Sequence, residues 1–250
     1  MKVIILAAGI GQRLGAHAAE RPKCLLEFGG ISLLQRHLRN LDQHQVSEIL
    51  LFTGFNRESI MDELAMTPCR TPVRTIYNPD FRSGSVISLW HAREALCSGE
   101  DIILMDADVL CAPAIINRLF ETGLANCFLL DRDFIPGDEP VKLCVHNGRL
   151  IDFRKQIDKD LQFDFQGESV GFFRFSSAIA RQLSGGLQGY IDSGQLQSPY
   201  EEAIRDLLLQ LPESFSYEDV TGLPWIEIDF PEDIERAGNE ILKQIENINH

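Results

Sequence analysis

Short apolar runs alternate with amphipathic helical patterns along the first half of the chain, and this alternation constrains the fold more than any other feature. The first run, residues 3–8, is unbroken and stops at Gly9, as a strand buried on both faces would. We expect further strands at 49–53, 73–77 and 101–105, and helices at 32–41, 57–64 and 85–96, with Ser32 and Ser85 as helix caps. This order predicts an α/β fold: a doubly wound, mostly parallel sheet with right-handed crossovers and helices on both faces.

The second half of the sequence has a different texture. After an expected strand at 127–131, Asn147-Gly148 separates strand-like runs at 141–146 and 149–153, and this dipeptide favours a two-residue hairpin turn. Further strands are expected at 161–165, 170–175, 214–220 and 225–228, with helices at 177–183, at 200–211 and from Pro231. No linker rich in proline, glycine or serine interrupts the chain. We therefore predict one domain, residues 1–250, in which an antiparallel β insert is built onto the sheet.

The charge of the chain limits its partners. With 23 basic and 37 acidic residues the formal net charge is −14, so we expect neither nucleic acid nor an anionic membrane as a partner. The apolar run at 3–8 is far too short to cross a membrane, and we expect a cytoplasmic protein. The 6 cysteines form no CxxC pair and no cluster with histidine, which favours reduced, buried thiols over a zinc site or disulfides.

A glycine-rich loop follows the first expected strand, at the place where open α/β sheets bind nucleotides. It reads Leu6-Ala7-Ala8-Gly9-Ile10-Gly11-Gln12-Arg13. Gly9 and Gly11 would let backbone N–H groups approach phosphate oxygens, and Arg13 would neutralise their charge. The glycine spacing is neither that of the dinucleotide fingerprint nor that of a Walker A loop. By itself, the loop is equally compatible with a structural turn.

The segment Arg21-Pro22-Lys23-Cys24-Leu25-Leu26 comes shortly after that loop. A single lysine before apolar residues is usually a surface residue. Together, however, the two segments resemble the LAAGxGxRL and RPKxLL signature of nucleotidyltransferases that join a nucleoside triphosphate to a phosphorylated metabolite. The resemblance implies a Rossmann-like nucleotidyltransferase fold in which about 1–130 binds the nucleotide and about 131–250 the acceptor. It implies catalytic roles for Lys23 and Arg13, and further nucleotide contacts from Leu6, Ala7, Ala8, Gly9 and Gly11.

Acidic residues come at the ends of two expected strands, Asp106-Ala107-Asp108 after one and Asp229 after the other. Carboxylates beside a triphosphate suit Mg²⁺, which takes one or two protein carboxylates and completes its shell with phosphate oxygens and water. The resemblance assigns the metal to Asp108 and Asp229, and places Asp106 in the nucleotide site. The alternative is that these carboxylates cap the helices that follow.

One segment is similar to a stretch of the bacterial phosphocholine and phosphonate cytidylyltransferases. It reads Asn78-Pro79-Asp80-Phe81-Arg82-Ser83-Gly84-Ser85, and Ser88-Leu89-Trp90 follows. The resemblance implies that Ser83, Ser85 and Ser88 contact the nucleotide. Gly84 and Ser85 stand where members of that group often carry asparagine, and a loop with an ordinary serine cap is the competing interpretation.

The expected β insert carries the candidate acceptor site. Lys155 resembles the family lysine that contacts the acceptor phosphate, and Lys142 is a second candidate; the alternative for either is a solvent-exposed hairpin charge. Glu168 and Gly171 belong to a Glu-x-x-Gly-Phe-Phe pattern that the family shows near its acceptor pocket. Tyr200 and Glu201, at the start of an expected helix, would line the same pocket; the alternative for the tyrosine is a place in the core.

These features predict an Mg²⁺-dependent cytidylyltransferase whose partners are CTP and a small phosphate or phosphonate acceptor. No general base is needed, because the second pKa of a phosphate is about 6 and the acceptor is already largely dianionic near neutral pH. Two alternatives stay open: the same chemistry with a sugar-1-phosphate, an inositol-1-phosphate or another nucleotide donor, and a catalytically silent, nucleotide-binding regulatory protein on this fold. Assembly of two copies of the chain as a homodimer is a further hypothesis.

Overall fold

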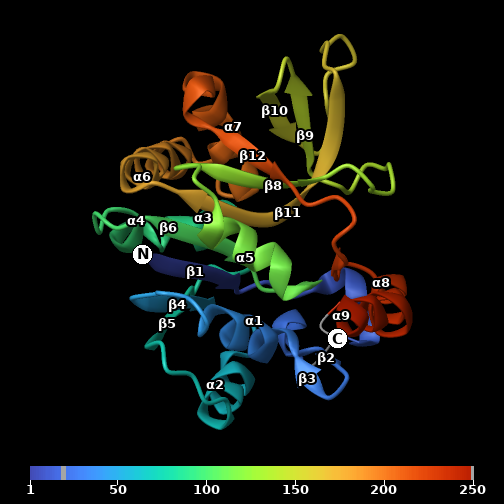
Figure 1. The fold of residues 1–250 in the computed structure, drawn as a ribbon. Helices are drawn as coiled ribbons and strands as arrows, with labels where there is room; N and C mark the ends of the chain where they lie inside the picture. Colours follow the sequence, from blue (N-terminus) through green and yellow to red (C-terminus); the bar gives the residue numbers. More distant parts are fainter. Residues whose placement is uncertain (18–20, 249–250) are drawn as a thin grey trace.

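The first half of the chain forms a parallel sheet, as its alternating pattern predicts (Figure 1). The structure is a computed structural model, and it describes residues 1–17 and 21–248. Four strands pair in parallel: β1 (Lys2–Ala7), β4 (Glu48–Thr53), β5 (Val73–Tyr77) and β6 (Ile102–Asp106). They lie in the order β5-β4-β1-β6, so the carboxyl ends of β1 and β6 are neighbours at one edge of the sheet.

Helices cover both faces of this sheet. On one face lie α1 (Leu33–Leu41), α2 (Arg57–Met66) and α5 (Pro113–Glu121), whose apolar residues share a core with the sheet. The other face is covered by α3 (Ser85–Trp90) and α4 (Arg93–Leu96), together with two later helices. Ser32 caps α1 as predicted, because its side chain accepts a hydrogen bond from the Gln35 N–H at 3.1 Å.

The second half adds antiparallel strands to the same sheet. These are β8 (Cys127–Asp131), β9 (Lys142–His146), β10 (Arg149–Arg154) and the long β11 (Phe165–Phe175). β11 pairs antiparallel with β6, β8 and β9, while β12 (Ser216–Asp219) pairs in parallel with β8. The sheet of the described chain thus has nine strands with a mixed pattern, and the predicted α/β fold with an antiparallel insert is confirmed.

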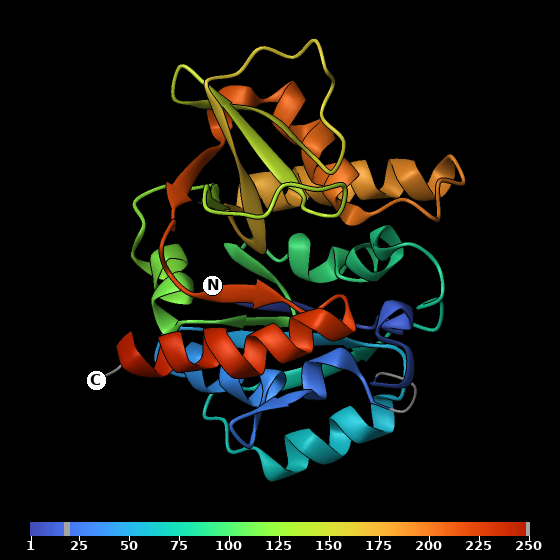
Figure 2. The ribbon, with the colours of Figure 1, turned by 90° about the vertical axis from the view of Figure 1, so that its right-hand side faces the viewer.

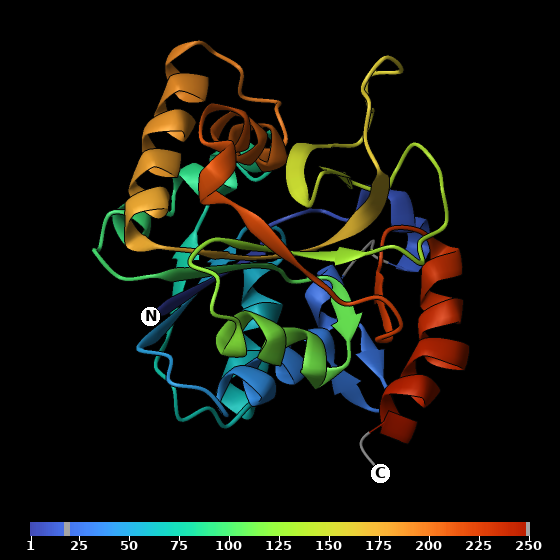
Figure 3. The same ribbon diagram turned by 45° about the horizontal axis from the view of Figure 1, so that its top comes forward.

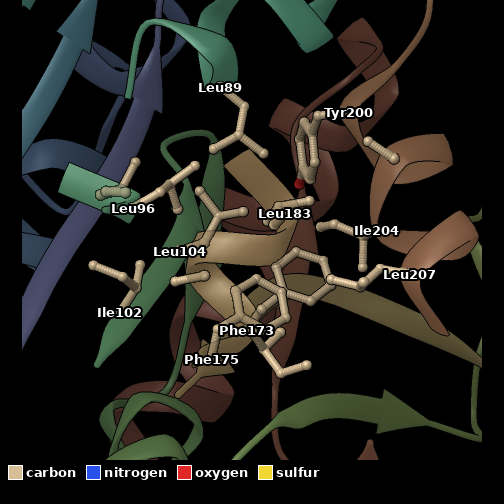
Figure 4. Packing of buried hydrophobic residues seen from close by; sticks show 14 of the residues in the cluster. Leu89, Leu96, Ile102, Leu104, Phe173, Phe175, Leu183, Tyr200, Ile204 and Leu207 are labelled. Atoms are coloured by element: carbon tan, nitrogen blue, oxygen red, sulfur yellow. The ribbon is translucent and has the colours of Figure 1, made fainter. Parts of the chain in front are cut away.

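Two more helices of the second half complete the layer above the sheet, α6 (Ser177–Asp192) and α7 (Tyr200–Gln210) (Figures 1 and 3). Figure 4 shows how Leu183 and Ile204 from these helices meet Leu104 and Phe173 from the sheet. Tyr200, at the first turn of α7, belongs to this core. The packing fixes the start of α7 beside the carboxyl edge of β6.

A small antiparallel ladder links the middle of the chain to its last segment. It pairs β7 (Val109–Cys111) with β13 (Trp225–Glu227), and the Ile228 N–H donates to the Asp108 carbonyl at 3.0 Å. The chain then runs into α8 (Pro231–Arg236), a π-helical turn (Ala237–Ile241) and α9 (Leu242–Ile248), seen as the continuous red helix in Figure 2. This ladder brings residues that are more than a hundred positions apart in the sequence to one place.

None of the helices in the described part of the chain is both long and apolar enough to cross a membrane. Several short elements complete the described chain. They are the 3-10 turns η1 (Gln12–His17), η2 (Lys23–Leu25) and η3 (Pro212–Ser214), and the paired strands β2 (Glu27–Phe28) and β3 (Ile31–Ser32).

Three local predictions are wrong. No strand separate from β11 exists at 161–165, because the ladder to β9 begins only at Phe165. The helix expected at 85–96 is interrupted after Trp90 and continues as α4. Ser85 does not cap α3: Gly84 is the N-cap residue, and the Ser85 hydroxyl accepts a hydrogen bond from the Tyr200 N–H at 2.9 Å, at the start of α7.

Candidate active site

The glycine-rich loop borders two adjoining cavities at the carboxyl edge of the parallel strands. The loop cavity, of about 350 Å³, is lined chiefly by residues 6–13, Lys23 and the segment 81–83. The central cavity, of about 370 Å³, shares Gly9, Arg13 and Lys23 with it and extends to the antiparallel insert. Gly11 adopts a φ of +68°, a conformation that glycine reaches without a steric penalty, so the loop can turn sharply after β1.

Lys23 lies between the two carboxylates that the family resemblance assigns to a metal. Its ammonium is 2.9 Å from Asp108 Oδ2 and 2.6 Å from Asp229 Oδ1, and all three side chains are largely shielded from solvent. Although burial disfavours a charge on Lys23, the two carboxylates raise the pKa of its ammonium above the usual range. Lys23 is therefore not a free surface lysine, and its charge is fixed where the two halves of the chain meet.

A third carboxylate, from Glu227, joins this pair. Asp108, Glu227 and Asp229 each offer an oxygen, and these oxygens lie within 4.8 Å of one another. Burial, and next the charges of Asp108 and Asp229, raise the pKa of the Glu227 carboxyl well above its usual range. A close group of half-buried carboxylates is the oxygen-rich, acidic donor set that Mg²⁺ prefers, so the residues present fit this cation.

Arg13 reaches the same group from the loop. Its guanidinium lies 3.0 Å from Asp229 Oδ2, 2.6 Å from Glu139 Oε2, and over the ring of Phe230 at 5.2 Å from the centroid. Glu139 in turn accepts a hydrogen bond from the Lys155 ammonium at 2.9 Å. One carboxylate therefore bridges the cation predicted for the nucleotide and the cation predicted for the acceptor phosphate.

Every residue predicted to bind the nucleotide lines one or both cavities. They are Leu6, Ala7, Ala8, Gly9, Gly11, Arg13, Lys23, Ser83, Ser85, Ser88 and Asp106. Two of the serines also hold the fold together, because the Ser88 hydroxyl accepts a hydrogen bond from the Asn78 amide at 3.0 Å and Ser85 meets α7 as described above. Their placement agrees with the prediction, and their contacts with a nucleotide stay predictions.

Asp106 and Tyr200 form a hydrogen-bonded pair at the wall of the central cavity. The Tyr200 hydroxyl donates to Asp106 Oδ2 at 2.6 Å. Burial, followed by the charge of Asp108, raises the pKa of the Asp106 carboxyl well above its usual range. Gly171 packs against the same carboxyl, since a Cβ added there would lie 2.6 Å from Asp106 Oδ2. Gly171 and Tyr200 thus line the cavity, as predicted, and also position Asp106.

Two of the predicted acceptor residues lie elsewhere. The Lys142 side chain is buried, and its ammonium donates to the carbonyls of Gly137, Pro140 and Lys155 at 2.7, 3.2 and 2.6 Å. Lys142 is not among the residues lining either cavity, because its charge is held by these three carbonyls, which come from the segments just before β9 and just after β10. Lys155 does line the central cavity, and its backbone is fixed there by Lys142.

Glu168 lines a third cavity, of about 260 Å³, on the other side of Glu227 and Asp229. Burial, and next the charge of Asp131, raises the pKa of the Glu168 carboxyl to about 7. Asp131 is itself held by the Trp225 indole N–H at 2.8 Å. Glu168 is therefore separated from the predicted acceptor site by the carboxylate group itself.

Among the residues of these walls to which sequence reasoning assigned no role are Glu227, Glu139, Arg82 and Phe81. Glu227 is two positions before Asp229 at the end of β13, and the strand period of two places both side chains on one face. This spacing could have identified it. Arg82 adds a third cation to the loop cavity, and its neighbour Phe81 lines both cavities. Glu139 follows from no local pattern.

Comparisons with known proteins identify the family of the chain. The model of the MobA-like NTP transferase domain matches residues 3–145. The chain is 28% identical over 252 residues to the CMP-5'-(3-aminopropyl)phosphonate synthase of Streptomyces rubellomurinus, a match that covers 95% of this chain and 38% of that protein. It is 25% identical over 244 residues to the bifunctional IPC transferase and DIPP synthase of Rubrobacter xylanophilus, covering 95% of this chain and 51% of the relative. The chain thus spans about half, or less, of the length of these two relatives.

A solved structure shares the fold. The CTP:phosphocholine cytidylyltransferase of Streptococcus pneumoniae superposes with a TM-score of 0.71 at 19% identity, over 96% of this chain and 98% of that chain. At this identity the likeness concerns the architecture, and it confirms the predicted nucleotidyltransferase-like α/β fold.

Proposed function

The chain belongs to the MobA-like NTP transferase family, and on this premise we propose that it transfers CMP from CTP to a small phosphate or phosphonate acceptor and releases pyrophosphate. The observation that carries the proposal is the central cavity, where Gly9 and Lys23 of the nucleotide half share one space with Lys155 and Gly171 of the insert. Two substrates bound on these two walls would meet beside Lys23 and Asp108. Such an arrangement supplies the proximity and orientation that nucleotidyl transfer requires.

The reaction can proceed without a proton acceptor from the protein. An acceptor oxygen forms a new bond to the α-phosphorus of CTP, the bond from that phosphorus to the bridging oxygen breaks, and pyrophosphate leaves with the electron pair. A phosphate-monoester acceptor is already largely deprotonated near neutral pH, since its second pKa is about 6. His37 lies near Asp108 but is not available as a proton acceptor for the substrate, because its side chain is buried. Burial lowers the pKa of His37 to about 4. It lies in the core rather than beside the acceptor wall.

The catalytic task of the chain is to hold charges in place. Lys23, fixed by Asp108 and Asp229, would face the phosphates that gain charge as pyrophosphate leaves. Arg13 is tied to the same group through Asp229 and would neutralise the other side of the triphosphate. Asp108, Glu227 and Asp229 would hold Mg²⁺, and the bound cation would supply neutralisation of phosphate charge.

CTP as the donor is supported by the comparisons. The Streptomyces relative is named as forming a CMP-linked product, and the S. pneumoniae enzyme is named for CTP. A sugar-1-phosphate or inositol-1-phosphate acceptor would use the same residues and is distinguished by assay. A silent regulatory protein is disfavoured, because Lys23, Asp108 and Asp229 are retained in direct contact. Assembly as a homodimer stays a prediction.

Pyrophosphate release tests the proposal. Each of the four ribonucleoside triphosphates is combined with Mg²⁺ and a panel of phosphonate, phosphocholine, sugar-1-phosphate and inositol-1-phosphate acceptors. We expect turnover with CTP and at least one small phosphate or phosphonate. Thermal stabilisation by each nucleotide at equal concentration is an independent measurement of the donor. Larger stabilisation by GTP or ATP than by CTP would contradict the donor assignment, and absence of turnover with every pair would contradict the activity.

A further inference from the structure

Glu201, on the first turn of α7, has an unpartnered oxygen at the wall of the central cavity. The residue lines the cavity next to Tyr200. Its Oε2 atom is shielded from solvent, yet none of the described residues donates a hydrogen bond to it. Buried carboxylate oxygens normally have donors, because leaving one without a partner costs as much as a lost charged hydrogen bond. An unsatisfied oxygen facing a substrate cavity indicates a donor that arrives with the substrate.

The neighbouring side chains are occupied with other partners. The Tyr200 hydroxyl donates to Asp106, and the Lys155 ammonium is bound to Glu139. Apolar groups from Val141, Phe153 and Phe173 form the adjoining wall. Burial raises the pKa of the Glu201 carboxyl, while its own backbone N–H and the charge of Lys155 act in the opposite direction. A second cation beside Glu201, in addition to Lys155, would therefore stabilise its ionised carboxylate.

A purely structural role explains Glu202 better than Glu201. Acidic residues are favoured in the first turn of a helix by its dipole, and both glutamates occupy that turn. Glu202 lies outside the cavity and pairs with Arg154 at 3.3 Å. Glu201 is directed to the cavity instead, where the helix dipole alone gives no reason to shield its Oε2 atom from water.

We propose that the acceptor carries a primary or secondary ammonium group and that Glu201 binds this group, opposite the end of the acceptor whose phosphate or phosphonate meets Lys155. This inference rests on the proposed nucleotidyl transfer and specifies its acceptor class. A zwitterionic acceptor places each of its charges near an opposite charge of the insert. Neutral sugar and inositol phosphates would leave Glu201 without a counter-charge.

The chemistry of Glu201 distinguishes between kinds of ammonium. An ammonium with N–H bonds can donate directly to the unpartnered oxygen, whereas a quaternary ammonium has no hydrogen to donate and is usually recognised by aromatic faces. The aromatic rings at this wall are engaged with one another: Phe173 makes edge-to-face contacts with Phe153 and Tyr200, at 5.8 and 6.2 Å between centroids. The wall therefore favours a hydrogen-bonding cation.

A matched series of acceptors tests this. Pyrophosphate release with Mg²⁺ and CTP is measured for 2-aminoethylphosphonate, 3-aminopropylphosphonate, their N-trimethyl analogues, and ethyl- and propylphosphonate. We expect kcat/KM for at least one primary amine to exceed that of its trimethyl and des-amino analogues by about 10-fold or more, the usual effect of one charged hydrogen bond. Because the ammonium is remote from the reacting phosphorus, the difference should lie mainly in KM.

Glu201→Gln and Glu202→Gln form the variant pair. In Glu201→Gln the preference for the amine should fall to within a few-fold of unity, because kcat/KM for the amine falls toward the value for ethylphosphonate. Glu202→Gln, one residue away in the same helical turn, should keep the preference. A general structural defect would lower the rates of all acceptors together and leave their ratio unchanged.

The outcomes separate this inference from the proposed function. Turnover in which the trimethyl or des-amino acceptors match the amines overturns the ammonium site and leaves the nucleotidyl transfer standing. An unchanged preference in Glu201→Gln overturns the role of Glu201. Absence of turnover with CTP and every acceptor, those of the wider panel above included, overturns the proposed function and the ammonium site with it.

Discussion

The two walls of the central cavity are built in different ways. The nucleotide wall comes from the parallel half, where the loop after β1, the η2 turn and the end of β6 lie at one edge of the sheet. The acceptor wall comes from β10, β11 and the first turn of α7, which are antiparallel or helical. All predicted nucleotide residues line the loop cavity or the central cavity, whereas Lys142 and Glu168, predicted for the acceptor, line neither of these two.

The difference has a geometric origin. In a parallel sheet the carboxyl ends of neighbouring strands point to the same edge, so residues just after β1 and β6 necessarily lie at that edge. In an antiparallel insert, successive strands point in opposite directions, and a shift of one residue moves a side chain to the other face. Lys142 and Lys155 lie on paired strands or just beyond them, yet one is buried and the other lines the cavity.

The largest effect is expected where the two walls meet. Asp108→Asn and Asp229→Asn each remove one of the charges that would hold Mg²⁺, so activity should fall by roughly three orders of magnitude, with partial rescue by Mn²⁺ or high Mg²⁺. Melting temperature without ligand should stay near that of the parent, since Lys23 keeps its other carboxylate partner. Pyrophosphate release and thermal unfolding measure these two quantities.

Two comparisons sharpen that experiment. The exposed Glu232→Gln variant, close to Asp229 in sequence, should keep full activity. Asp106→Asn should lower activity less than Asp108→Asn, because Asp106 is already bound to Tyr200. Normal rates in both Asp108→Asn and Asp229→Asn would refute the metal site, and an active Asp108→Asn beside an inactive Asp106→Asn would show that the wrong aspartate was chosen.

Lys23→Ala tests the nucleotide wall alone. The ammonium is expected to act on the transition state, so kcat should fall by about two orders of magnitude or more. Lys243→Ala, an exposed lysine on α9, serves as the control and should keep the parental kcat. An unchanged kcat in Lys23→Ala would mean that the ion pairs with Asp108 and Asp229 are only structural.

Gly171→Ala tests the acceptor wall. Gly171 has a φ of +78°, and an added Cβ would lie 2.6 Å from Asp106 Oδ2. We expect the free energy of unfolding to fall by about 1–3 kcal/mol from backbone strain, with a further loss from this contact. Gly99→Ala is a matched control, since its φ of +85° is similar but nothing lies within 4 Å of the added Cβ. If Gly171→Ala and Gly99→Ala lower the free energy of unfolding equally in chemical denaturation, the added Cβ at position 171 does not clash with the Asp106 carboxylate.

Glu168 makes the acceptor half sensitive to pH. Its pKa is raised to about 7 from 4.5, so between these values the folded state binds more protons than the unfolded state, and this contribution to stability is lost as pH rises. Glu168→Gln removes the free-energy cost of ionising this carboxyl in the folded state. The variant should therefore gain stability over the parent between pH 5 and pH 8, by up to about 3 kcal/mol in denaturant titrations. A difference between the two proteins that does not change with pH contradicts the assignment.

Glu139 connects the two walls, and the smallest effect is expected there. Its carboxylate is bound to Arg13 and Lys155, both of which would have to exchange it for substrate phosphates. All three side chains are substantially exposed, so Glu139→Gln should lower KM for both substrates by only a few-fold. The exposed neighbour Asp138→Asn should leave KM unchanged. An increase in KM would instead mean that Glu139 positions the two cations.

The sequence predicts most of the parallel half because local signals and tertiary position coincide there. The apolar run of β1, the glycines after it and Lys23 follow one another within about one βα unit, and the serine cap of α1 is equally local. Ser85 shows where such signals fail. The position of Ser85 is typical of a helix cap. However, α7 packs against α3, and the Tyr200 N–H at the start of α7 donates to the Ser85 hydroxyl.

The sequence by itself determined the alternating α/β pattern, the glycine loop, and the residues Lys23, Asp108 and Asp229 as a candidate group. The alternating pattern depends on periodicity and the loop on its glycines, whereas the choice of Lys23, Asp108 and Asp229 depends on the resemblance of their segments to the nucleotidyltransferase signature. Only the tertiary structure decided that β7 and β13 pair, which brings Glu227 into that group, that Lys142 is held by three carbonyls, and that one oxygen of Glu201 is left without a partner at the cavity wall. Each of these depends on contacts between segments distant in the chain, and the energy of such contacts is not encoded in any local pattern.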